Sequence, residues 1–275
     1  MSGNAGLFWL ARRETLRVWK LWTQTVLAPV ISSTLFIVVF GLSLGGRIRH
    51  VDGFQYRQFI VPGLIAMAMV QAAYNNNASS IFQARFDRYV HDVLAAPMHA
   101  WQMNVGFNVG GFIRALMIGA AMLVLALPLT RVPVHQPLEL VVAVGLALPL
   151  TGVPVHQPFE LVVAVALALL LFSSFGTVVG IYAQTWDHTT FVSNILILPL
   201  TFLGGVFYSV NILPSPWHEL SHVNPMFYLV QSIRYGFLGT SDVSIWLALG
   251  VTAGLAIPAF LWSHWLFATG RKLKS

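Results

Sequence analysis

The sequence predicts an all-α polytopic membrane protein with six transmembrane helices. Its composition is too apolar for a water-soluble globule, and it contains six stretches long enough to cross a bilayer. Of its 275 residues, 57% are hydrophobic and 9% are charged, and the mean hydropathy is +0.74. A soluble domain carries about 25% charged residues. The composition therefore disfavours a soluble enzyme, and we expect no nucleic-acid partner despite the net charge of +6.

The six expected spans each contain about 20 mostly apolar residues. They cover residues 22–44, 59–81, 104–128, 159–182, 190–211 and 244–267. Cations near the ends of spans favour the cytoplasmic side. Placing both termini inside puts nine Lys and Arg on cytoplasmic segments and five on outer segments. We therefore expect a multi-pass protein of the inner (plasma) membrane with both termini in the cytoplasm.

Ahead of the first span, residues 7–21 are expected to form an amphipathic helix in the membrane interface. At 100° per residue, Phe8, Val18 and Trp19 share one arc. The opposite arc carries four cations suited to the anionic headgroups of membrane lipids: Arg12, Arg13, Arg17 and Lys20. Glu14 falls among the apolar residues and departs from this pattern. The helix is either a topology anchor or a specific contact with a partner.

A tandem duplication joins the third and fourth expected spans. Residues 127–147 and 148–168 are identical at 18 of 21 positions. Each copy contains a Val-Pro-Val-His-Gln-Pro segment whose prolines interrupt a helix, and the stretch Leu138–Leu150 between them is too short to cross a bilayer. We expect the extra copy to form a non-spanning excursion on the outer side of a single transmembrane domain covering residues 1–275.

Polar side chains inside the second and third spans mark a candidate route through the membrane. Gln71, Asn75 and Ser79 recur every four residues and share one helix face. Such a face is unfavourable against lipid, so it either binds a neighbouring helix or lines a hydrated route. Arg114 lies near the middle of the third span, where a guanidinium is costly. It is expected to face the route or an anionic group, or else to donate a structural hydrogen bond to a neighbouring helix.

The loop after the second span is expected to form a short amphipathic helix on the cytoplasmic side. Its apolar stripe includes Phe86 and Leu94, its charged face includes Arg85, Asp87 and Arg88, and Pro97 ends it. These six residues are candidates for insertion into the groove of a partner. The alternative is an ordinary interfacial loop helix.

One motif that is absent and one that is present indicate what chemistry the chain could perform. The chain has no phosphate-binding Gly-x-x-x-x-Gly-Lys-Ser/Thr loop, so a nucleotide, if one is used, would bind another polypeptide, and we expect no cofactor in this chain. The segment His218-Glu219-Leu220-Ser221-His222 matches the His-Glu-x-x-His pattern of zinc peptidases. Its helix would be barely two turns long, and no third ligand is obvious, so we expect no metal site.

A second short helix follows this segment. Asn224 is a suitable N-cap, Pro225 suits the first helical position, and Gly239 can end the helix. With about 13 residues it would be too short to span the membrane. We expect a partly inserted outer helix ahead of the last span.

Several of these segments resemble the ABC type-2 exporter permeases, in particular their inner-membrane YadH and NodJ branch. The similarity covers nearly the whole chain, and its motifs lie in the family's order and spacing. They are Phe59–Ile65, Asn75–Ser80, the Phe86, Leu94 and Pro97 loop, Leu203–Ser209, Leu213-Pro214, Asn224-Pro225 and Arg234–Gly239. Arg114 also matches an arginine of this branch.

The resemblance implies a six-span permease subunit with an N-terminal interface helix and two short re-entrant helices before the last span. It implies that the loop Arg85–Pro97 couples to a separate ATPase, present in two copies, and that the permease forms a homodimer. The expected function is ATP-driven export of an amphipathic cargo: a glycolipid, a lipid-linked glycan or a hydrophobic drug. The chain itself would not be an enzyme. Two other readings stay open: a membrane-embedded zinc peptidase and an ion-coupled carrier that acts alone.

Overall fold

The computed structural model describes residues 5–43, 50–51, 53–130 and 157–273. Within these ranges the long elements are all helices, and the only sheet is a two-stranded antiparallel hairpin of β1 (His50–Val51) and β2 (Phe54–Gln55). The longer helices are α1 (Ala5–Lys20), α2 (Ala28–Ser43), α3 (Tyr56–Phe86), α5 (Ala100–Thr130), α7 (Pro158–Tyr182), α11 (Pro225–Leu238) and α12 (Ile245–Thr269). The shorter ones are α4 (Val90–Ala95), α8 (Trp186–Phe191), α9 (Leu198–Leu203) and α10 (Trp217–Val223). The all-α prediction is confirmed.

Four described helices are long and apolar enough to cross a membrane. They are Thr23–Phe40, Ala100–Val124, Pro158–Tyr182 and Ile245–Thr269. The other two expected spans correspond to α3 and to the continuous helical run Trp186–Leu203, which contain more polar residues. The six-span count stays a prediction.

The fifth expected span, residues 190–211, differs from the helical run in the structure. The run begins at Trp186 and ends at Leu203. Gly204 follows it as the C-cap, and Gly205 has φ +79°, a left-handed conformation that glycine adopts without steric cost. The chain then turns and forms only a single 3₁₀ turn at Val210–Ile212. The Gly-Gly pair explains why the helix stops early.

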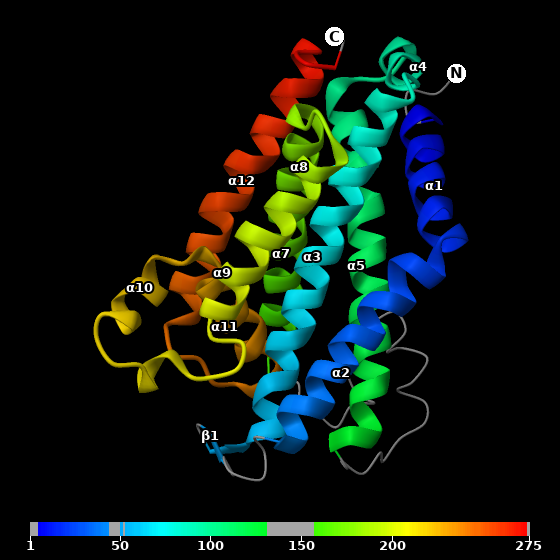
Figure 1. Ribbon diagram of the computed structural model, residues 1–275. Coiled ribbons are helices and arrows are strands. Elements are labelled where there is room, and N and C mark those ends of the chain that lie inside the picture. Colours follow the sequence, from blue (N-terminus) through cyan, green and yellow to red (C-terminus); the bar gives the residue numbers. More distant parts are fainter. Residues whose placement is uncertain (1–4, 44–49, 52, 131–156, 274–275) are drawn as a thin grey trace.

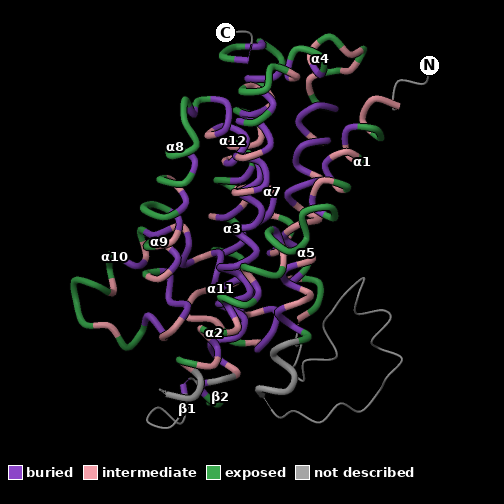
Figure 2. Tube along the Cα trace, turned by 45° about the vertical axis from the view of Figure 1, so that its right-hand side comes forward, coloured by how far each residue is buried: buried purple, intermediate pink, exposed green. Residues whose placement is uncertain are grey.

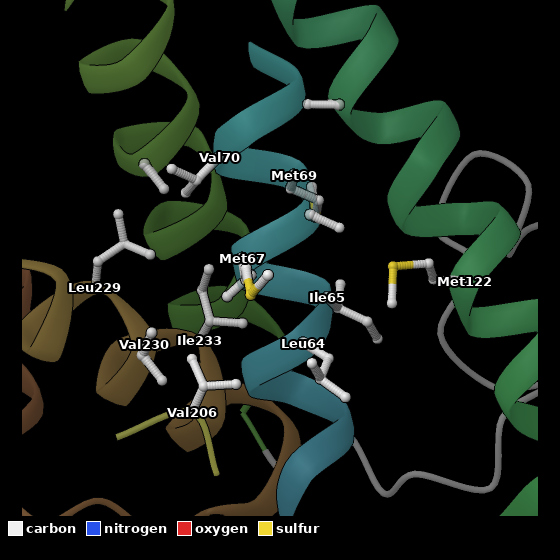
Figure 3. Close-up of a cluster of buried hydrophobic side chains, with 14 of the residues drawn as sticks. Leu64, Ile65, Met67, Met69, Val70, Met122, Val206, Leu229, Val230 and Ile233 are labelled. Atoms are coloured by element: carbon white, nitrogen blue, oxygen red, sulfur yellow. The ribbon is translucent and has the colours of Figure 1, made fainter. Parts of the chain in front are cut away.

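Helix α3 is the centre of the bundle and packs against α2, α5, α7 and α11. Every residue from Phe59 to Val70 is buried, which Figure 2 shows as a continuous purple tube. In Figure 3, Leu64 and Ile65 point toward Met122 of α5, while Val230 and Ile233 of α11 lie on another side of α3. Burial on all sides places the stretch Phe59–Val70 at the centre of the bundle.

A glycine allows a close approach between α3 and α7. A Cβ atom on Gly176 would lie less than 3.0 Å from the carbonyl oxygen of Tyr74. Such a separation is far below ordinary contact distance, so only glycine permits this packing. The small residue thereby brings the polar groups of α3 within hydrogen-bonding distance of α7.

Helix α11 has the ends that its sequence predicts. The Asn224 side chain accepts a hydrogen bond from the backbone N–H of Met226 at 3.0 Å, Pro225 occupies the first position, and Gly239 is left-handed with φ +72°. These local rules give a helix of 14 residues, about 21 Å long. It is too short to span a bilayer, as expected.

Both termini lie at one end of the bundle, next to α4, while β1 lies toward the other end (Figure 1). The duplicated segment falls largely outside the described residues: α5 ends at Thr130 and α7 begins at Pro158. The predicted excursion therefore stays a prediction.

Candidate functional site

The predicted polar face of α3 is the part of this helix that is not fully covered. Gln71, Asn75 and Ser79 are partly exposed, whereas the residues between them are buried, and Gln83 one turn further is exposed. We call these four residues the α3 polar stripe. The amide nitrogen of Gln71 is buried and has no hydrogen-bond partner in the part of the chain that the structure describes. A donor of this kind needs a partner such as water or a ligand.

The other polar side chains of α3 hold helices together. Asn77 is fully buried, and its amide nitrogen donates to the carbonyl oxygen of Ser173 at 2.9 Å and to the hydroxyl of Thr177 at 3.1 Å. It also lies 3.4 Å from the side-chain oxygen of Asn108 on α5. Asn77 therefore joins neighbouring helices, whereas a route-lining role for Gln71, Asn75 and Ser79 stays a prediction.

The run of α8 and α9 lies beside the polar stripe. Tyr74 of α3 donates its hydroxyl to the carbonyl oxygen of Thr189 at 3.0 Å. The next residues of this run include the exposed polar side chains of Thr190 and Asn194. Asn194 lies in a π-helical turn, Val192–Ile197, a distortion that is frequent at functional sites. Polar groups thus come from two neighbouring helices.

Arg114 makes the structural hydrogen bond that was one of its expected roles. Its Nε donates to the carbonyl oxygen of Thr25 at 3.2 Å. The α-helical donor to that carbonyl would be residue 29, which is Pro29 and has no N–H. The arginine therefore serves a backbone acceptor beside the π-helical turn Thr23–Leu27 that joins α1 to α2.

The buried face of α1 contains a charged residue, which the simple amphipathic pattern does not predict. Glu14, which departs from the amphipathic pattern, is 1% exposed and lies 2.7 Å from Arg13 and 3.3 Å from Arg17. It also accepts a hydrogen bond from Ser80 of α3 at 2.8 Å. Arg17 in turn donates to the backbone carbonyl of Asn76 at 3.0 Å. These two arginines bind the bundle because a buried carboxylate attracts them, whereas Arg12 and Lys20 are exposed.

The candidate coupling loop is built differently from the single helix that we expected. Helix α3 continues to Phe86, a turn follows with Arg88 at φ +62°, and α4 ends at Ala95, before Pro97. Phe86 is 70% exposed, and Asp87, Arg88 and Pro97 are exposed. Leu94 is half-buried.

Buried residues anchor this loop to the bundle. Val90 and Val93 are buried, and burial raises the pKa of the Tyr89 hydroxyl above its ordinary value. Arg85 does not belong to the free charged face: its guanidinium donates to the carbonyl oxygens of Gly180 at 3.2 Å and Ala183 at 2.9 Å. It thereby caps the C-terminus of α7, where carbonyls lack helical partners and a cation is favourable.

The histidine motif does not gather a metal-ligand set. Within the described ranges, no three His, Asp or Glu residues form a group that could hold a metal ion. The His222 ring is bonded through Nδ1 to the carbonyl of His218 at 2.8 Å. Asp242, a distant candidate ligand, already accepts from the Gln231 amide at 2.7 Å and from the backbone N–H of Val210 at 3.0 Å. The geometry gives the zinc peptidase no support.

Sequence reasoning assigned no role to Arg234, which is 2% exposed. Its guanidinium lies 3.9 Å above the Phe59 ring and donates to the carbonyl oxygen of Gly205 at 2.6 Å. It connects α11 to the start of α3 and to the Gly-Gly turn. The sequence contains a signal for this role, because a charged residue in a short apolar helix needs a buried partner.

This arrangement defines a polytopic helical membrane protein with polar groups at the centre of its bundle and a loop helix at one end. The chain belongs to the ABC-2 type transporter family, whose model matches residues 5–238. It is 37% identical to the inner membrane transport permease YadH of Escherichia coli K12, over 98% of this chain and 99% of that protein. It is 25% identical to nodulation protein J of Rhizobium leguminosarum bv. viciae, over 93% of this chain and 92% of that protein.

Proposed function

We propose that this chain is the transmembrane permease subunit of an ATP-driven exporter of the inner membrane, working with a separate ATPase. The observation that carries the proposal is the α3 polar stripe: between Gln71 and Gln83, the partly exposed face of this central helix is polar. Polar side chains are costly against lipid. If this face of α3 had only a structural role, we would expect its polar side chains to be buried or replaced by apolar ones. The unpartnered Gln71 nitrogen supports contact with water or cargo at this face.

The proposed subunit crosses the membrane six times with both termini in the cytoplasm. Termini at one end of the bundle suit an even number of crossings (Figure 1). The crossings would be the four apolar helices together with α3 and the run Trp186–Leu203. The exposed aromatic side chains of α1, Phe8, Trp9 and Trp19, would lie in the membrane interface beside Arg12 and Lys20.

In the proposed complex, two permease copies face one another and two ATPase copies bind their cytoplasmic ends. The loop of α4 presents Phe86, Asp87 and Arg88 outward from a buried base, a shape that suits insertion into a groove of the ATPase. ATP binding would bias the permease between two conformations, because the nucleotide-bound partner binds one of them better. The cargo would be amphipathic, since a polar stripe within an apolar bundle offers surfaces for both kinds of group.

Affinity purification of the tagged chain in mild detergent tests this proposal. We expect an ATPase subunit with a phosphate-binding loop to co-elute, and ATP hydrolysis to accompany it. Replacing both Asp87 and Arg88 with residues of opposite charge should lower that hydrolysis while the amount of permease in the membrane stays unchanged. Export by the purified chain alone, driven by an ion gradient, would contradict the proposal and favour the carrier.

A further inference from the structure

We propose that an apolar pouch between α9, α10 and α11 binds a hydrocarbon chain of the exported cargo. This inference rests on the proposed function and adds the cargo class. The three helices lie together at one side of the bundle (Figure 1). They enclose a cavity of about 370 Å³, within the range of small-molecule sites. Its main lining residues are Leu200, Leu203, Tyr208, Leu213, Trp217 and Leu220.

The walls of the pouch offer almost no group for a polar ligand. Four side chains with polar atoms reach it: three of them are bonded within the protein, and the fourth, Trp217, offers only its indole N–H. The Ser221 hydroxyl donates to the carbonyl of Trp217 at 3.0 Å, and the Asn224 amide donates to that of Leu200 at 2.6 Å. The Tyr208 hydroxyl lies 3.4 Å from the carbonyl of Leu203. A polar ligand would lose its water and gain few partners in exchange, so these walls favour an apolar occupant.

The titratable residues of α10 lie outside the helix face that lines the pouch. At 100° per residue, Trp217, Leu220 and Ser221 share the face that lines the pouch, whereas Glu219 lies on the opposite face and His218 and His222 lie to one side. The rim is also apolar: Trp217 is 54% exposed, Leu220 53% and Val223 80%. A contiguous apolar rim of this kind is typical of a surface that contacts lipid or an apolar ligand.

The position of the pouch favours cargo as its occupant. It lies on α9, the end of the same helical run that passes the α3 polar stripe at Tyr74 and Thr189. A cargo whose polar head follows the stripe would bring its chain along this run to the pouch. The two surfaces together fit an amphipathic molecule with at least one alkyl chain.

Photolabelling of the full chain in phosphatidylcholine nanodiscs tests the proposal. The probe is dodecyl glucoside with a diazirine at the end of its chain, and mass spectrometry maps the adducts. We expect labelling of Leu203–Leu220 several-fold above that of the exposed α12 stretch Leu255–Trp262. Excess dodecyl glucoside should remove it, and butyl glucoside should not. Equal labelling of both stretches, or no competition, would contradict the proposal.

A matched pair of variants shows whether the pouch itself is responsible. Leu220→Trp fills the pouch, whereas Leu261→Trp replaces an α12 leucine of similar exposure, 57% against 53%. Only Leu220→Trp should lower the labelling, by several-fold. Both replacements are at exposed positions, so we expect both variants to fold. If one of them does not, the labelling pattern of the wild-type protein still tests the proposal.

Two other occupants would each overturn the inference. Labelling by a diazirine-bearing phosphatidylcholine that excess dodecyl glucoside does not displace would indicate a resident membrane lipid. A disulfide between two copies carrying Leu220→Cys, readily detected because the chain has no other cysteine, would indicate a second copy on the pouch. The labelling needs no ATPase, so a failure to co-purify one would refute the proposed function without altering these results.

Discussion

Arg85 and Arg88 lie three residues apart in one loop and should behave in opposite ways when each is replaced by methionine. Arg85 donates two hydrogen bonds to carbonyls at the end of α7, whereas Arg88 is exposed in the turn. Arg85→Met should therefore lower the free energy of unfolding, and Arg88→Met should leave it nearly unchanged. Arg88→Met should instead lower the ATP hydrolysis of the complex.

The loss in free energy of unfolding that we expect for Arg85→Met follows from its two hydrogen bonds to α7. A hydrogen bond from a charged donor contributes about 1.5–3 kcal/mol when buried, and measured side-chain bonds in membrane proteins average about 0.6 kcal/mol. Arg85 is half-buried, so we expect a loss of about 2 kcal/mol, which is roughly a 30-fold change in the folded-to-unfolded ratio.

Equilibrium unfolding by dodecyl sulfate, followed by circular dichroism, measures this difference. Arg88→Met is the matched control because it removes the same charge from the same loop. Equal stability of Arg85→Met and wild type would refute the cap on α7. Equal losses of stability in both variants would refute the distinction between an anchored and a free arginine.

Three further variants, the first with a matched control, test the packing around α3 and the loops that Asp242 connects. Gly176→Ala should cost about 1–3 kcal/mol through overpacking against Tyr74, whereas Gly250→Ala, with nothing within 4 Å, should be neutral or slightly stabilising in the same unfolding assay. Asn77→Ala should cost about 1–2 kcal/mol because it removes the two hydrogen bonds that this amide donates to α7; an unchanged unfolding midpoint would argue against these bonds. Asp242→Asn should speed limited proteolysis of the loop around Val210, because an amide cannot accept all the hydrogen bonds that this carboxylate accepts; an unchanged cleavage rate would contradict its bridging role.

The sequence predicted those features that depend on local rules. The polar stripe followed from a repeat of four residues on α3, and the ends of α11 followed from Asn224, Pro225 and Gly239, whose capping needs no distant partner. The boundary at Gly204 was missed because hydropathy continues through the Gly-Gly turn into Val206 and Phe207.

Roles that depend on tertiary contacts could not be predicted from the sequence. Glu14 departs from the amphipathic pattern because its partner, Ser80, lies 66 residues away. Arg85 looked like part of a charged face because the α7 carbonyls that it caps are 95 and 98 residues away. In each case, the residue type indicated a need for a partner, and only the fold identified it.

The water accessibility of α3 tests most directly whether the polar stripe lines a route through the membrane. The chain contains no cysteine, so single cysteines at Asn75 on the stripe and at Ala73, which is 0% exposed, form a clean pair. In membrane vesicles containing the ATPase complex, a small charged thiol reagent should label Asn75→Cys rapidly and at a rate that changes with ATP, while Ala73→Cys stays unlabelled. If Asn75→Cys is as unreactive as Ala73→Cys with and without ATP, the stripe does not line a route through the membrane.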